Sequence, residues 1–126
     1  MIQDEATEAI FSRLSSLTHY THHLADLPPS PDGPHTIYWP SPGQTGSRKV
    51  SGRAARTRGF GSVVCVNNTS PGAVDLANKV VMLFDGWRLP GGSIVTTTVG
   101  PAISDPDQRA GYCWSATVQL SYRLNR

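Results

Sequence analysis

The chain has 126 residues, a formal net charge of +2 and a hydrophobic content of 38%. This length suits one domain with a modest core, and ten prolines with twelve glycines indicate short elements joined by long loops. The charge argues against a domain that is basic throughout, as nucleic-acid-binding domains usually are, and no apolar run reaches the roughly 20 residues of a membrane helix.

Residues 2–18 have the spacing of an amphipathic helix. The apolar positions that fall on one face are Ile2, Ala6, Ala9, Ile10, Leu14 and Leu17. Asp4, Glu5 and Glu8 lie in the first turns, where the helix dipole favours negative charge. They also stand where a secretory signal would need a basic start and an apolar run, so we expect a soluble protein made in the cytoplasm.

A linker is predicted at residues 19–34, because the "LPPSPDGP" at its end continues neither a helix nor a strand. His19, His22 and His23 fall in this linker, and His35 follows it. A metal site needs three or four ligands held in fixed geometry, which a linker does not supply. We therefore favour solvated histidines near the end of the first helix, and we expect no metal site.

A short strand, "HTIYW", is predicted at residues 35–39. Residues 41–57 show no hydrophobic periodicity and are predicted to form a long loop. The next predicted strand, "GFGSVVCVNN" at 59–68, has apolar residues on both faces, as expected for a central strand.

Positive charge is concentrated in and just after the predicted loop. Five of the eleven Lys and Arg residues fall there, and residues 33–74 contain no acidic residue. The five are Arg48, Lys49, Arg53, Arg56 and Arg58. We predict that they contact a partner protein or DNA and that the loop becomes ordered only against that partner. The alternative is that these charges only keep an exposed loop in water, and no aromatic residue lies among them to stack on bases.

A second helix is predicted to begin at Ser70 and Pro71, where a capping hydroxyl precedes a proline in the first helical position. Gly86 is its predicted end. Its predicted apolar stripe consists of Val74, Ala77, Val81 and Phe84, with Val80 at the margin.

Two strands are predicted after this helix. Residues 93–99, "SIVTTTV", are rich in β-branched residues, and residues 112–124 alternate apolar and polar side chains for thirteen residues. The element order α-β-β-α-β-β predicts an α+β fold in which helices cover one face of a four-stranded, mainly antiparallel sheet.

No segment has a pattern typical of an enzyme. There is no nucleophile-elbow serine and no cysteine beside a histidine, and the glycines at 59–61 and 90–92 lack a phosphate-binding spacing. We therefore expect no catalytic residue, no cofactor and no enzymatic activity. For Cys65 and Cys113 we favour two buried free thiols over a disulfide bridge, because the cytoplasm is reducing.

Several segments in succession carry a likeness to a known family. A strand ending in "YWPSPG" precedes a Ser-Gly-Arg loop, "RTRGFGSVVCVNNTSPGAVDLANKVVMLFDG" runs from a strand into a capped helix, and the last strand ends in "SYRL". In the order and spacing of these elements, residues 1–124 resemble the tail terminator (tail-completion) proteins of long-tailed bacteriophages, particularly those infecting actinobacteria. Where the family often has a glycine turn, this chain has Asn67, Asn68 and Thr69, and asparagine tolerates the left-handed backbone that such a turn needs.

The resemblance implies a single tail-terminator-like domain over residues 1–126 that assembles as a hexameric ring in the virion. Such a ring stops tail-tube polymerisation at the head-proximal end and presents a surface to the head-side connector. The implied partners are further copies of the chain, the tail-tube protein, a head-closure protein and, without sequence preference, the DNA that passes through the ring. The alternatives are another neck or head-tail connector protein and a small non-specific nucleic-acid-binding module.

Overall fold

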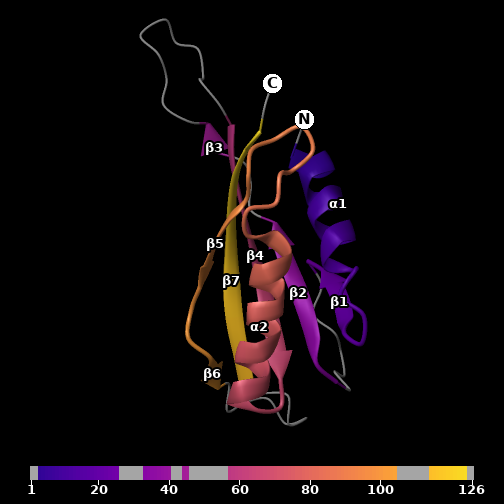
Figure 1. The fold of residues 1–126 in the computed structure, drawn as a ribbon, viewed down its shortest axis with the longest axis vertical. Coiled ribbons are helices and arrows are strands. Elements are labelled where there is room, and N and C mark those ends of the chain that lie inside the picture. The colour runs from indigo at the N-terminus through magenta and orange to yellow at the C-terminus, as the bar shows by residue number, and fades with distance from the viewer. Residues whose placement is uncertain (1–2, 26–32, 41–43, 46–56, 105–113, 125–126) are drawn as a thin grey trace, which may run out of the picture.

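The computed structural model describes residues 3–25, 33–40, 44–45, 57–104 and 114–124. Their elements are, in chain order, α1 (Gln3–Leu14), β1 (Thr21–Leu24), β2 (His35–Pro40), β3 (Gln44–Thr45), β4 (Thr57–Asn67), α2 (Ser70–Phe84), β5 (Thr96–Val99), β6 (Ile103–Ser104) and β7 (Trp114–Leu124) (Figure 1). The predicted α+β class is confirmed. The predicted number of strands is wrong, because the sheet formed by the described residues has seven strands rather than four.

All of these strands belong to one open sheet. Its main path runs β1-β2-β4-β7-β5, while β3 pairs with β4 and β6 pairs with β7. The pairings are antiparallel except that of β1 with β2. The two long central strands, β4 and β7, are in register from Thr57 opposite Leu124 to Asn67 opposite Trp114. The sheet is therefore mainly antiparallel, as predicted.

Three short strands are not predicted by the sequence. β1 lies in the predicted linker 19–34, β3 lies in the predicted loop 41–57, and β6 follows β5. Each has four residues or fewer, which is too short for a period-two pattern to show. They form where a longer neighbouring strand offers free backbone donors and acceptors, which only the tertiary structure reveals.

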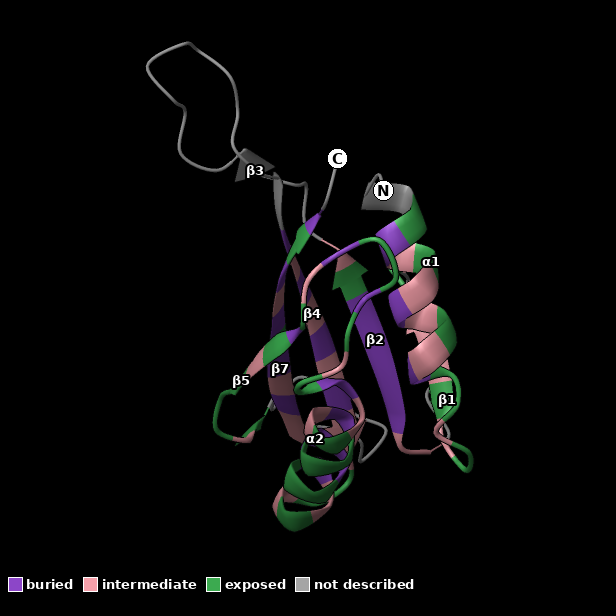
Figure 2. Cartoon of the chain, turned by 45° about the horizontal axis from the view of Figure 1, so that its top comes forward, coloured by how far each residue is buried: buried purple, intermediate pink, exposed green. Residues whose placement is uncertain are grey.

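The two helices pack on the same face of the sheet, as predicted (Figure 2). The residues that they bury there are Ala6, Ile10 and Leu14 of α1 and Ala73, Leu76, Ala77, Val80 and Phe84 of α2. They meet the alternate residues of the central strands Val63, Cys65, Ala116, Val118, Leu120, Tyr122 and Leu124. Arg13 joins the helices, because its Nε donates to the Leu83 carbonyl at 2.7 Å and its guanidinium lies 4.8 Å from the centre of the Trp87 ring.

Both helices differ in detail from their predictions. α1 ends at Leu14 instead of residue 18. In α2 the predicted stripe is confirmed at Ala77 and Phe84, which are buried together with the marginal Val80. It is wrong at Val74, which is 40% exposed, and Val81 is only partly buried. The stripe prediction lacked Ala73 and Leu76, which are buried. The small side chains of Ala73 and Ala77 let the helix approach the sheet closely.

The start of α2 is capped by Thr69, and the prediction that Ser70 is the cap is wrong. Thr69 has extended backbone angles, and its Oγ1 accepts a hydrogen bond from the Gly72 amide at 3.0 Å. Ser70 is already the first helical residue. The predicted end at Gly86 is confirmed, because Gly86 has a φ of +79° directly after the C-cap Asp85.

Replacing Thr69 by alanine is expected to lower the free energy of unfolding by about 1 kcal/mol, because the Gly72 amide then loses its partner. Ser70→Ala is the matched control and should change stability by less than about 0.5 kcal/mol. Urea denaturation of the two variants and the parent measures both values. A larger loss for Ser70→Ala than for Thr69→Ala would contradict the assignment of the cap.

Cys65 is a free thiol buried in the core, as predicted. Burial raises its pKa to about 12, so the thiol stays protonated and unreactive at neutral pH. Cys113 lies outside the described residues. No described helix is both long and apolar enough to cross a membrane.

Candidate functional site

Of the five predicted basic contact residues, only Arg58 lies in the described part of the chain, at the end of the sheet where β4 begins. Arg48, Lys49, Arg53 and Arg56 lie outside the described residues. The backbone of Arg58 lies in β4, where its register partners are Gln44 of β3 and Arg123 of β7. The predicted loop 41–57 is thus partly wrong, since β3 forms inside it and pairs with the start of β4 (Figure 1).

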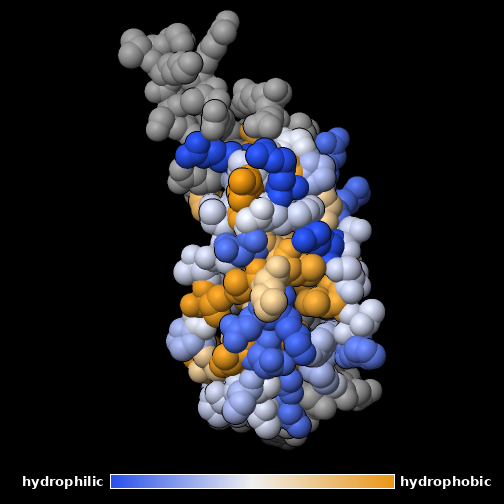
Figure 3. Space-filling model, viewed as in Figure 1, coloured by the Kyte–Doolittle hydropathy of each residue, from blue (hydrophilic) through white to orange (hydrophobic). Residues whose placement is uncertain are grey.

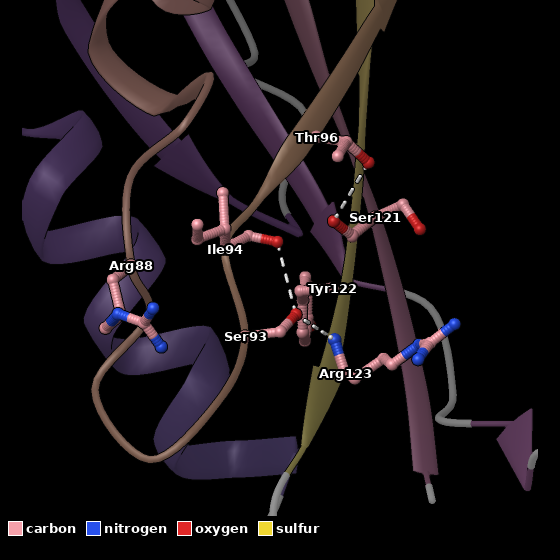
Figure 4. Close-up of a pocket in the computed structure, with 7 residues that line it drawn as sticks. All are labelled: Arg88, Ser93, Ile94, Thr96, Ser121, Tyr122 and Arg123. Atoms are coloured by element: carbon pink, nitrogen blue, oxygen red, sulfur yellow. Dashed lines mark hydrogen bonds between the residues drawn. The ribbon is translucent and has the colours of Figure 1, made fainter.

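An open hollow of about 630 Å³ lies beside β7 near this end of the sheet. It is lined by Arg88, Ser93, Ile94, Thr96, Ser121, Tyr122 and Arg123 (Figure 4). We call it the arginine hollow. Its walls come from β7, from β5 and from the segment that joins α2 to β5.

Hydrogen bonds hold that joining segment against β7. The Arg123 amide donates to Ser93 Oγ at 2.8 Å, and the Ser93 amide donates to the Arg123 carbonyl at 2.9 Å. Ser93 Oγ donates to the Ile94 carbonyl at 3.2 Å, while Thr96 Oγ1 donates more weakly to the Ser121 carbonyl at 3.4 Å. The serine and threonine hydroxyls are therefore occupied in shaping the hollow.

The charged groups of the lining are the guanidinium groups of Arg88 and Arg123. Figure 4 shows the side chains of Arg88 and Arg123 on opposite sides of the segment that contains Ser93. Among the described residues one ion pair forms, between Lys79 and Asp75. Neither arginine therefore has an acidic partner in that part of the chain. Two guanidinium groups without a lining carboxylate suit an anionic group, a carboxylate or a phosphate.

Neither of these two arginines is marked by a pattern in the sequence. Arg123 is one polar position in an alternating strand, and Arg88 follows the end of a helix, so neither belongs to a charge cluster in the sequence. The pairing of β4 with β7 brings Arg123 next to Arg58 across 65 residues of chain. Only the hydrogen-bonded segment between α2 and β5 brings Arg88 to the same hollow.

The prediction of solvated histidines in a linker is wrong for His22, whereas His19 is exposed and His35 begins a strand as predicted. His22 is in β1, where its Nε2 donates to the Leu17 carbonyl at 2.8 Å and its Nδ1 accepts from the Thr36 hydroxyl at 2.6 Å. His35 is 4% exposed, and its ring meets that of His23 edge-on with 5.8 Å between centres. Among the described residues no group of three His, Cys, Asp or Glu side chains could hold a metal ion.

The fold is expected to lose stability as the pH falls below about 6.5. Burial lowers the pKa of His35 from its ordinary value of 6.5, the nearby His23 lowers it further, and the hydrogen bond to the Gly33 carbonyl partly opposes both. The imidazole of His35 therefore binds a proton more tightly in the unfolded chain than in the folded one. The contribution of neutral His35 to stability is present above pH 6.5 and is lost as the pH falls toward the folded pKa. Urea unfolding at pH 7.5 and pH 5 measures the loss.

The matched comparison is His35→Gln against His19→Gln, since His19 is exposed. The first variant should show a smaller change in stability between the two pH values than the parent. The second should keep the change of the parent. Equal pH dependence in the parent and in His35→Gln would contradict the role of His35.

Comparison with known proteins identifies the fold. No protein-family model matches the chain, and no curated protein matches it in sequence. One solved structure that carries no functional name is 20% identical with a TM-score of 0.64, and the match covers 100% of this chain and 97% of that one. A second is a chain from the virion of a native gene transfer agent particle, 15% identical with a TM-score of 0.53 over 94% of this chain and 91% of that one. At these identities the matches show a shared fold over nearly the whole length.

Proposed function

We propose that this chain is a structural protein of a phage virion and, more specifically, a tail terminator. It forms a hexameric ring at the head-proximal end of the tail. The ring stops polymerisation of the tail tube and joins the tail to the head-side connector. The observation that carries the proposal is the match of nearly the whole fold to a chain from a gene transfer agent virion. The resemblance of residues 1–124 to tail terminator proteins gives independent support.

The exposed surface suits a protein that is buried in an assembly. Large apolar side chains that reach solvent include Leu24, Trp39, Val74, Met82, Ile94, Val99 and Ile103. Met82 is 84% exposed and Ile103 is 62% exposed, and Figure 3 shows hydrophobic side chains across the middle of the face that carries α2. Contiguous exposed apolar surface commonly marks a protein–protein interface. We accordingly propose further copies, the tail-tube protein and a head-closure protein as partners, and no enzymatic role.

Light scattering coupled to size exclusion tests the assembly role. The purified chain is run alone at high concentration and then with the tail-tube protein of the same particle. We expect ring-sized oligomers in at least the second case, since such a ring can depend on the tube end for closure. A chain that stays monomeric and does not bind tubes under either condition would contradict the proposal.

A second candidate is a non-specific nucleic-acid-binding module, which the unpaired arginines of the hollow and the basic segment around Arg58 favour. Its signature is binding to random duplex DNA that weakens steeply with salt. Neutralising about five phosphates gives a slope of roughly −4 to −5 in a plot of log K against log salt. Absence of binding at ~50 mM salt would remove this candidate, because phosphate contacts are strongest at low salt.

A further inference from the structure

We infer that the arginine hollow of one subunit binds the α1 carboxylates Glu5 and Glu8 of the next subunit. The ring then closes through repeated contacts between opposite edges of the sheet. The inference rests on the proposed function, because it requires that the chain assemble with itself.

Glu5 and Glu8 form an exposed acidic stripe on α1. They are three positions apart and therefore adjacent on the helix surface, on the side opposite the buried Ala6, Ile10 and Leu14. Neither carboxylate has a basic partner among the residues that the structure describes. The stripe therefore complements the hollow in charge. Within the described part of the chain, it presents two carboxylates that lack a basic partner, and the hollow presents two guanidinium groups that lack an acidic partner.

The hollow borders the β5 edge of the sheet, whereas the stripe lies on the outer side of α1. The strand order places β1 and β5 at the two edges of the sheet, and the hollow borders β5 and β7. Figures 1 and 2 both show α1 on the side of β1 and β2, away from β5. The stripe and the hollow therefore face different neighbours. Such a head-to-tail contact produces a closed ring when the rotation between subunits closes.

The chemistry of the hollow favours a protein carboxylate over a DNA phosphate. A guanidinium group binds a carboxylate through two parallel hydrogen bonds, which fixes orientation as well as charge. Between the two arginines the lining includes Ile94, an apolar side chain that is 47% exposed and that a helix surface would cover. A strand of DNA would instead bind along an open groove lined by a row of cationic side chains. The chain also carries a matching acidic surface on the outer side of α1.

Charge reversal tests this contact. Glu5→Lys/Glu8→Lys makes both surfaces positive, and Arg88→Glu/Arg123→Glu makes both negative. Each variant alone should need at least about tenfold more protein than the parent to assemble, since like charges now face each other. An equimolar mixture should assemble again, because the two kinds of subunit can alternate around a ring of six. Asp75→Lys/Lys79→Asp, which reverses an exposed ion pair of α2, is the matched control and should assemble like the parent.

Cysteine cross-linking distinguishes the head-to-tail contact from a symmetric one. A chain carrying both Glu8→Cys and Arg123→Cys should give a ladder of covalent oligomers on oxidation, whereas each single variant should give none. Cys65 is buried and does not compete, and Cys113→Ser is included in every variant so that it cannot take part. The inference is wrong if the parent forms oligomers, the double-cysteine variant gives no cross-links and the charge-reversal variants assemble like the parent. The proposed function would stand in that case.

Two other results are informative. If the arginine variant assembles normally but loses DNA binding, the hollow is a phosphate site and the inference is wrong. If the parent stays monomeric even with tail tubes, the inference and the proposed function both fail.

Discussion

Gly59→Ala is expected to destabilise the fold by about 3 kcal/mol, at the upper end of the cost of overpacking a core. Gly59 lies on the buried face of β4 directly opposite Tyr122 of β7, and a Cβ atom at this position would overlap the Tyr122 ring. Tyr122 is 2% exposed, so its ring has no room to move aside. Urea denaturation monitored by circular dichroism measures the loss.

A double-mutant comparison assigns that loss to the contact. Tyr122→Leu removes the ring, so adding Gly59→Ala to it should cost much less than adding Gly59→Ala to the parent. Gly100→Ala is the matched control, since its Cβ would meet only the Thr117 carbonyl oxygen at 3.9 Å, an ordinary contact. Equal costs of Gly59→Ala in the two backgrounds would show that the ring is not the cause.

Neutralising the basic segment is expected to abolish tail completion while leaving the fold intact. The variant changes Arg48, Lys49, Arg53, Arg56 and Arg58 to glutamine, and it removes five of the eleven Lys and Arg residues. Substitutions away from packing usually change stability by less than about 0.5 kcal/mol each, whereas a contact with DNA or an acidic partner would lose its electrostatic attraction. Electron microscopy should show tubes of irregular length or tails that do not join heads.

The control exchanges the same five positions between lysine and arginine, which keeps every charge. It should support normal tails if charge is what the partner recognises. Normal infectious particles from the glutamine variant would instead show that the segment is only a solvated surface.

Sequence patterns predicted the elements in which periodicity is long. β7 alternates over its full length, and α2 has a capping signal, an apolar stripe and a glycine stop, so both were found close to their observed bounds. β1 was missed because its polar sequence, "THHL", carries no strand pattern. Its parallel pairing with β2 holds it in place, and no local signal reports that pairing.

The sequence predicts less of the candidate site than of the fold. The basic segment is visible as a run of like charge, yet most of it lies outside the described residues. The arginine hollow depends on Arg88 and Arg123, which come together only through the β5–β7 edge and the Ser93 hydrogen bonds. Glu5 and Glu8 were visible as residues favoured by the helix dipole. Their proposed second role depends on the hollow, which only the tertiary structure forms.

Locating the chain on assembled tails tests the central proposal most directly. Cryo-electron microscopy of tailed particles assembled with this chain, together with tails made without it, would locate the chain and report tail length. The proposal predicts a ring of this chain at the head-proximal end of each tail, and tubes of uncontrolled length in its absence. Finding the chain along the tube or in the capsid, or normal tails without it, would contradict the proposal.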